Sequence, residues 1–213
     1  MMKKKTEEII KHLKKHYTNT RTTLDHKSPY ELLISTILSA QTTDKAVNLV
    51  TPKLFAKYPD PESLAKASLP SIEKVIKSLG FFRNKSKSIK NCCRMLVDDF
   101  EGEVPRSMDE MTRLPGVGRK TANVVLGNAF GIDEGIVVDT HVGRISRRLG
   151  LSREKNAEKV ERDLMEIVPK KDWTAFSHLL IAHGRNICMS RKPHCSECFL
   201  DSLCPKTDVK DSV

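Results

Sequence analysis

The chain has 213 residues, which suits one compact unit or two small domains and is long enough to bury a hydrophobic core. Its 37 basic and 27 acidic residues give a net charge of +10, spread along the chain, and this excess favours an anionic partner. No apolar run approaches the ~20 residues of a membrane span, and the N-terminus lacks the apolar segment of a secretory signal, so we expect a soluble protein with no membrane partner and no targeting signal.

Almost every segment has apolar residues at helical spacing, and the sequence predicts an all-α fold. The first helix is expected over about residues 6–16, with Ile9 and Leu13 in the core. The next helix should begin after Ser28, because a serine followed by proline and, three residues on, by glutamate is typical of a helix start. A further apolar stripe stops at Gly80, where the third predicted helix ends.

Asn84 is then expected to cap a helix whose apolar face includes Cys92 and the cysteine after it, both as buried thiols. Ser107, with a glutamate three residues later, predicts a second capped helix. The β-branched run at 136–138 is too isolated to form a sheet. Residues beyond Cys204 are polar and are expected to be loose.

Four cysteines lie close together near the end of the chain, with the spacing C-x6-C-x2-C-x5-C. They are Cys188, Cys195, Cys198 and Cys204. Thiolates that converge in this way bind one soft metal centre or cluster. Two disulfides would need an oxidising compartment, which the absent secretory signal disfavours. On spacing alone, zinc and an iron–sulfur cluster stay open, although zinc ribbons usually carry two C-x2-C pairs and this chain has one.

The segment 114–122, L-P-G-V-G-R-K-T-A, predicts two helices joined by a tight turn that holds Gly116 and Gly118. Glycine permits a positive φ and lets another backbone approach closely. The N–H groups of the turn and the start of the second helix favour an anion such as a phosphate, a contact that positions DNA without reading its bases. An ordinary helical hairpin is the alternative, but Arg119 and Lys120 directly after the turn favour the phosphate site.

Downstream, V-V-D-T-H-V places Asp139 at the start of another helix. Aspartate is a good N-cap, so from this motif alone a structural role is the simpler hypothesis and a catalytic role is the alternative. Lys120, taken alone, is expected to contact a phosphate.

The chain resembles the endonuclease III family of iron–sulfur, helix-hairpin-helix DNA glycosylases and abasic-site lyases. The resemblance rests on three motifs that occur in this order: L-P-G-V-G-R-K-T-A-N-V-V, V-D-T-H and the four cysteines. L-S-A-Q-T-T-D at 38–44 and G-E-V-P at 102–105 extend the resemblance over nearly the whole chain. It implies two helical domains with a DNA-binding cleft between them. The helical-barrel domain would span 23–134 with its hairpin at 108–129, and the cluster domain would combine 1–22 with 135–213, its cluster loop lying at 188–204.

The resemblance also implies one [4Fe–4S] cluster on the four cysteines and a catalytic pair, Lys120 and Asp139. The lysine would attack C1′ of the damaged nucleotide, the base would leave, and a Schiff base would lead to β-elimination on the 3′ side. A cationic neighbourhood, with Arg119 adjacent, and partial desolvation favour the neutral amine. Asp139 is expected to stabilise positive charge at the sugar and to shuttle a proton.

The target base must leave the helical stack before it can react. By the same resemblance, Gln41 and the loop at 80–85 fill the gap that the extruded base leaves in the duplex. Phe81 is expected to be the wedge and the phenylalanine after it to lie in the core. The family more often has an aliphatic residue at the wedge position. Asp44 and His141 are candidates for base recognition, His141 being equally suited to local hydrogen bonds. The remaining implied DNA contacts are Leu114, Gly116, Gly118, Arg119, Arg191 and Lys192.

The sequence thus predicts a monomeric, cytoplasmic enzyme, associated with the nucleoid if its source is prokaryotic, that removes oxidised pyrimidines from damaged double-stranded DNA and cleaves the abasic site. One alternative is a monofunctional glycosylase of the same superfamily, such as one that removes adenine from mispairs, but those enzymes lack a lysine at the position of Lys120. A non-catalytic DNA-binding module is a third reading. The presence of both Lys120 and Asp139 argues against it.

Overall fold

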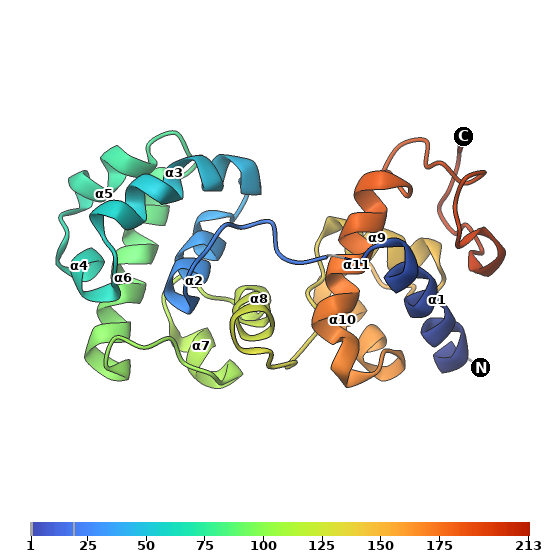
Figure 1. Ribbon diagram of the computed structural model, residues 1–213, viewed down its shortest axis with the longest axis horizontal. Coiled ribbons are helices and arrows are strands. Elements are labelled where there is room, and N and C mark those ends of the chain that lie inside the picture. The colour runs from blue at the N-terminus through green and yellow to red at the C-terminus, as the bar shows by residue number, and fades with distance from the viewer. Residues whose placement is uncertain (1, 19) are drawn as a thin grey trace. The chain divides into compact units, whose positions relative to one another are not determined.

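The protein is described by a computed structural model that covers residues 2–18 and 20–213 and is built from helices (Figure 1). Within these residues there is no β-strand, which confirms the all-α prediction, and no helix is long and apolar enough to cross a membrane. The chain forms two compact units. The discontinuous unit combines Met1–Arg21 with Asp133–Val213, and the continuous unit is Thr22–Ile132.

The continuous unit is arranged around one apolar helix. Its helices are α2 (Pro29–Leu38), α3 (Asp44–Lys57), α4 (Pro61–Lys66), α5 (Leu69–Ile76), α6 (Phe82–Phe100), α7 (Met108–Arg113) and α8 (Arg119–Phe130). Eight of the ten residues of α2 are buried, and this helix packs against α3, α6 and α8. A helix that is apolar on nearly every side is stable only when others surround it, so α2 forms the centre of this unit.

Two predicted helix starts in this unit are confirmed. The hydroxyl of Ser28 accepts a hydrogen bond from the backbone N–H of Glu31 at 3.2 Å, at the start of α2. The hydroxyl of Ser107 accepts one from the N–H of Glu110 at 3.3 Å, at the start of α7. Each bond satisfies a donor that has no partner within its own helix, and it therefore fixes where the helix begins.

The predicted start of α6 is wrong. Asn84 lies inside the helix, and the N-cap position is taken by Phe81, whose φ of +56° is left-handed. The backbone N–H of Lys85 donates to the carbonyl of Phe81 at 3.0 Å, so the first helical turn closes before Asn84 can act as a cap. No propensity favours phenylalanine in this conformation, and the sequence gives no sign of it.

The discontinuous unit combines a segment from the start of the chain with a longer segment from its end. Its elements are α1 (Met2–His16), α9 (Thr140–Arg148), α10 (Ala157–Ile167), α11 (Trp173–Asn186) and two short 3-10 turns, η1 (Lys170–Asp172) and η2 (Asp201–Leu203). Helix α11 packs against α9 and α1, and α10 packs against the same two helices. Helix α1 starts four residues earlier than predicted and buries Ile9 and Leu13 completely, as expected.

The end of the chain, which is expected to be loose, is exposed and makes a few contacts with the cysteine-rich loop (188–204) and with α9. The N–H of Val213 donates to the carbonyl of Pro193 at 3.0 Å, and the N–H of Ser196 donates to the carbonyl of Val213 at 3.1 Å. Asp208 forms an ion pair with Arg147 at 3.6 Å. These contacts give the segment partners, and its mobility stays a prediction.

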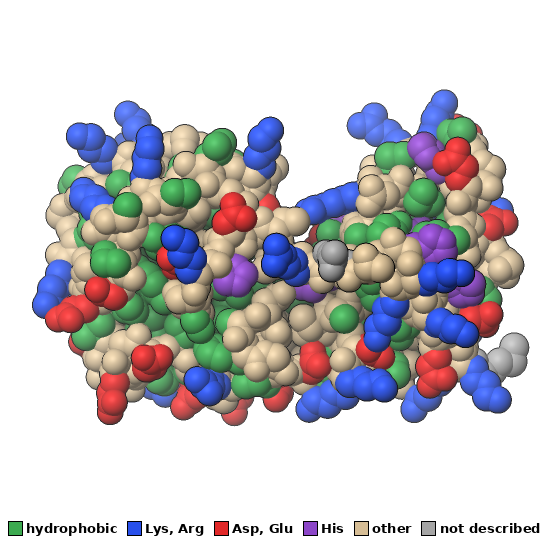
Figure 2. All heavy atoms as spheres, viewed as in Figure 1, with side chains coloured by type: hydrophobic (Ala, Val, Ile, Leu, Met, Phe, Trp, Pro, Cys, Tyr) green, Lys and Arg blue, Asp and Glu red, His purple; other side chains and the backbone are tan. Residues whose placement is uncertain are grey.

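Basic side chains are spread over the surface. Figure 2 shows Lys and Arg on the visible face of both units, with Asp and Glu between them. The excess positive charge is therefore a property of the whole chain, as the sequence indicated.

Candidate functional site

Helices α7 and α8 form the predicted hairpin, and its turn depends on Gly116. This residue has a φ of +82°, and a Cβ added to it would lie 2.9 Å from the Cβ of Ser88 and 3.3 Å from the Cγ2 of Ile37. Both the backbone conformation and the close packing therefore require glycine. Gly118 differs, because its φ is −96° and a Cβ there would meet nothing within 4 Å. Gly118 matters instead as the residue at which α8 begins.

Gly118 is the N-cap of α8 and offers no side chain to cap the helix. The first N–H groups of an α-helix have no partner within the helix, and the dipole adds partial positive charge there. Gly118, Arg119 and Lys120 are all exposed, so this helix start is open to an anion. Leu114 is only 2% exposed, so the predicted contact at that position is restricted to its backbone.

Asp139 is the N-cap of α9. Its Oδ1 accepts hydrogen bonds from the N–H groups of His141 and Val142, each at 2.8 Å, and its Oδ2 lies 2.9 Å from the Nδ1 of His141. The Asp139 side chain keeps 22% of its surface exposed. The N-cap role predicted for Asp139 is confirmed. Its second oxygen, Oδ2, does not cap the helix and contacts the imidazole of His141 instead. Asp139 belongs to the discontinuous unit, whereas Lys120 belongs to the continuous unit.

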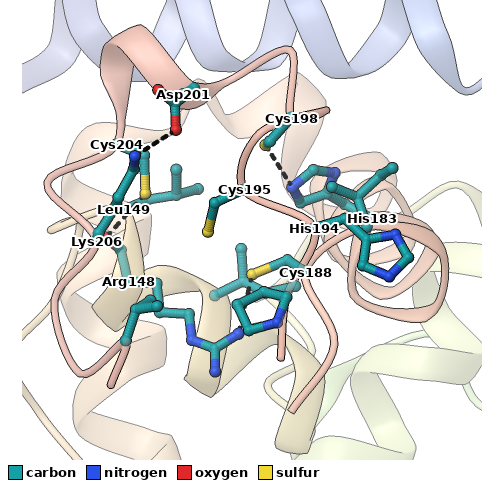
Figure 3. Close-up of a pocket in the computed structure, with 14 residues that line it drawn as sticks. Arg148, Leu149, His183, Cys188, His194, Cys195, Cys198, Asp201, Cys204 and Lys206 are labelled. Atoms are coloured by element: carbon teal, nitrogen blue, oxygen red, sulfur yellow. Dashed lines mark hydrogen bonds and ion pairs between the residues drawn. The ribbon is translucent and has the colours of Figure 1, made fainter. Parts of the chain in front are cut away.

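The four cysteines of the predicted metal site line a single cavity in the discontinuous unit. Figure 3 shows their thiols turned toward one common space. In the described part of the chain, no group of three or more His, Cys, Asp or Glu side chains is arranged to hold a single metal ion. Four thiols that line one cavity are the donor set of a soft metal centre or cluster.

Two arginines of α9 hold the chain at the first cysteine. Arg148 is 6% exposed, and its guanidinium donates to the Sγ of Cys188 at 3.3 Å and to the carbonyls of Met189 at 2.6 Å and Ser190 at 3.0 Å. Arg144 donates to the carbonyl of Cys188 at 2.9 Å. The sequence did not reveal these residues, because R-I-S-R-R has no feature that tells a buried arginine from a solvated one.

A buried histidine supports the third cysteine. The Nε2 of His183 lies 3.6 Å from the Sγ of Cys198, and its Nδ1 lies 3.2 Å from the hydroxyl of Tyr17. Burial lowers the pKa of His183 to about 4, so this imidazole is neutral at physiological pH. The sequence does not predict this contact.

Two residues predicted to enter the DNA are exposed in the continuous unit. Gln41 follows α2 and has a φ of +53°. Phe81 is 64% exposed, whereas Phe82 packs against the core. Asp44 begins α3 and accepts a hydrogen bond from the hydroxyl of Thr23. Phe81 is therefore at the surface and Phe82 is partly buried against the core. The roles of these residues toward DNA stay predictions.

The remaining predicted DNA contacts lie on the cysteine-rich loop. Arg191 and Lys192 are exposed between the first two cysteines. The Nζ of Lys192 lies 3.9 Å from Asp211 near the end of the chain, an ion pair in which both side chains stay about 70% exposed. Exposed pairs of this kind are weak, so Lys192 can exchange this carboxylate for a phosphate.

The hairpin and its flanking helices match a known family model. Residues 34–170 match the model of the HhH-GPD superfamily base excision DNA repair protein. The fold and the glycine turn thus define a helix-hairpin-helix protein of base excision repair. Endonuclease III of Synechocystis is 53% identical over 207 residues, covering 97% of this chain and 94% of the relative, and endonuclease III of Escherichia coli K12 is 41% identical over 211 residues, covering 99% and 100%. The chain belongs to the endonuclease III family.

Solved structures agree with this assignment. A trapped covalent intermediate of endonuclease III with DNA superimposes with a TM-score of 0.90 at 44% identity, covering 96% of each chain. A non-covalent endonuclease III–DNA complex gives a TM-score of 0.89, also at 44% identity, covering 96% of this chain and 95% of the other. The predicted resemblance is confirmed.

Proposed function

We propose that this protein removes oxidised pyrimidine bases from double-stranded DNA and then cleaves the strand at the abasic site. Its membership of the endonuclease III family favours this reaction over the monofunctional alternative. The observation that carries the proposal is Lys120, an exposed amine in the first turn of a helix that no side chain caps, directly after a glycine turn suited to a phosphate. A lysine held beside a phosphate is well placed to reach the adjoining sugar.

The reaction forms and breaks bonds at the sugar. The neutral amine of Lys120 attacks C1′ as the bond from C1′ to the base breaks, and ring opening gives a protonated Schiff base. Loss of a proton from C2′ then expels the phosphate at C3′, which breaks the strand on the 3′ side. Asp139 is proposed to stabilise positive charge at the sugar through Oδ2, because Oδ1 is engaged in capping α9. His141 holds that second oxygen in place.

A test of this function uses the wild-type protein and two duplexes. A duplex with an oxidised pyrimidine should yield free base, strand cleavage without alkali and a covalent adduct after borohydride reduction. Adenine release from a mispair, with cleavage only after alkali, would instead support the monofunctional alternative. Tight binding with no base release from either duplex would support a non-catalytic module.

We further assign one [4Fe–4S] cluster to Cys188, Cys195, Cys198 and Cys204. When bound, the cluster joins four points of a loop that has few helical residues of its own, and so contributes folding free energy. Purified protein should contain iron and absorb broadly in the visible range. A colourless protein with one equivalent of zinc would contradict the assignment.

Replacing Arg148 by methionine should loosen the cysteine-rich loop. The substitution keeps an apolar stem but removes the hydrogen bonds to the carbonyls of Met189 and Ser190, each worth about 0.5–1.5 kcal/mol. We expect the variant to lose its visible absorbance to a chelator several times faster than wild type. Arg153→Met, an exposed arginine beyond α9, is the matched control and should lose it at the wild-type rate.

DNA binding should depend steeply on salt. With roughly 5 phosphate contacts, the slope of log affinity against log salt should be about −4 to −5. Arg191→Ala should reduce the magnitude of that slope by about 1, because one phosphate contact is lost. Lys66→Ala, which removes an exposed cation already paired with Glu62 on α4, should leave the slope unchanged. A slope near zero in the wild type would contradict the phosphate contacts proposed for the hairpin and the loop.

A further inference from the structure

Lys85 is a buried lysine near the start of α6. It is 6% exposed, whereas Lys87 on the same helix is exposed. Its Nζ donates a hydrogen bond to the hydroxyl of Thr42, and no other hydrogen bond or ion pair of this amine occurs within the described residues. Burial lowers the pKa of Lys85. An ammonium group has three donors, and burying it against one neutral acceptor costs free energy, so this position calls for an explanation beyond stability.

The two partners of Lys85 lie beside the two residues proposed to enter the duplex. Its side chain bonds to Thr42, which directly follows Gln41. Its backbone N–H bonds to the carbonyl of Phe81 at 3.0 Å. One residue therefore contacts both the turn after α2, which carries Gln41, and the start of α6, which carries Phe81, although these segments are about 40 residues apart in the sequence.

Both segments hold an unfavourable backbone conformation at their exposed residue. Gln41 has a φ of +53° and Phe81 a φ of +56°, and both lie in the left-handed region that residues other than glycine rarely adopt. Such conformations cost free energy and persist where the surrounding structure holds them, which is common at functional sites. The partly buried bond from Lys85 to Thr42 is suited to hold them, because it joins the two segments directly and its donor side chain is shielded from solvent.

We propose that Lys85 is a positioning residue for base extrusion: its bond to Thr42 fixes Gln41 and Phe81 relative to each other, so that they enter the duplex together as the damaged nucleotide leaves it. This inference rests on the proposed function of the protein and on the roles predicted for Gln41 and Phe81 inside the duplex. Lys85 itself touches no DNA in this account. It acts by keeping the side chains of Gln41 and Phe81 at a fixed distance from each other. Less conformational entropy is then lost when both enter the gap left by the extruded nucleotide.

A purely structural lysine makes a different prediction. If Lys85 served only to stabilise α6, its loss should lower the melting temperature and should weaken every activity of the protein alike. Replacing this amine by an apolar side chain of similar length is instead expected to leave stability equal or higher, because the poorly solvated charge is removed and Thr42 keeps the hydrogen bond that its hydroxyl already donates to the carbonyl of Ala40 at 3.4 Å. Loss of extrusion without loss of stability therefore separates the two roles.

The experiment measures base extrusion with the full chain. A duplex with a non-cleavable abasic analogue carries 2-aminopurine opposite the analogue, and its fluorescence reports disruption of the stack. Lys85→Met and Thr42→Val should each lower the rate of the fluorescence rise by about tenfold to a hundredfold, the usual effect of a misplacement near 1 Å. Thr42→Ser keeps the hydroxyl and should restore the rate to within about threefold of wild type. Lys87→Met, on the exposed face of the same helix, is the matched control.

Two further measurements complete the test. The double variant Lys85→Met/Thr42→Val should extrude the base no more slowly than either single variant, because both substitutions remove the same hydrogen bond. Strand cleavage of single-stranded abasic DNA needs no extrusion, so Lys85→Met should lose at least tenfold more activity on a duplex lesion than on that substrate. The inference would be overturned by any of three results. Lys85→Met could extrude the base at the wild-type rate, the losses could add in the double variant, or Lys85→Met could lose equal activity on both substrates and have a lower melting temperature. A wild-type protein that cannot cleave the duplex lesion would instead contradict the proposed function.

Discussion

Lys120→Ala is expected to lose cleavage of abasic-site DNA by about 10⁴-fold or more, because removal of a covalent nucleophile eliminates the Schiff-base route altogether. Lys120 is exposed and is the second residue of α8, so its truncation removes no buried contact and should change the free energy of unfolding by less than about 0.5 kcal/mol. Single-turnover cleavage of an abasic duplex, with the melting temperature measured alongside, checks both statements.

Lys120→Arg is the matched control for the phosphate contact. Arginine keeps the positive charge and can bind the same phosphate, but it stays protonated and cannot form the Schiff base. The arginine variant should therefore bind DNA within a few-fold of wild type and still fail to cleave it. Cleavage at an appreciable fraction of the wild-type rate by either variant would show that the nucleophile lies elsewhere.

Asp139→Asn is expected to lower base removal by about 10² to 10⁴-fold while leaving the fold nearly intact. Asparagine is as good an N-cap as aspartate, so its side-chain oxygen can still accept from the N–H groups of His141 and Val142. What the substitution removes is the negative charge that we propose stabilises the sugar. Base release under single-turnover conditions is the measurement, with thermal unfolding as the stability readout.

Asp139→Ala supplies the comparison, because it removes both the charge and the cap. Its cap loss should cost about 1 kcal/mol, and for a chain of this size that lowers the melting temperature by roughly 2–4 °C. Base release should fall as far as in the asparagine variant. If Asp139→Asn kept wild-type activity and Asp139→Ala did not, the residue would serve only as the cap of α9.

The features that sequence analysis predicted well are those in which the spacing itself carries the chemistry. The L-P-G-V-G turn specifies a positive φ and close packing at one residue, and Gly116 has both. Four cysteines within one short loop must lie near one another, and they line one cavity. The helix starts at Ser28 and Ser107 depend on side chains three residues apart, so local sequence was sufficient to predict them.

The features that it missed depend on contacts between distant segments. Nothing in R-N-K-S-K-S distinguishes Lys85 from Lys87, because burial is decided by the helix face turned toward Thr42 of another segment. Arg148 is likewise buried because its guanidinium finds carbonyls about 40 residues away. The error at Asn84 has a different origin: α6 starts at a left-handed Phe81, a conformation that no local propensity of phenylalanine predicts.

The central claim is that the amine of Lys120 forms the covalent bond to the sugar. The most direct measurement reduces the wild-type complex with abasic DNA by borohydride, digests protein and DNA, and locates the sugar remnant on a peptide by mass spectrometry. We expect the added mass on Lys120. A remnant on another lysine, or on the N-terminal amine, in a protein that cleaves at its full rate would contradict it.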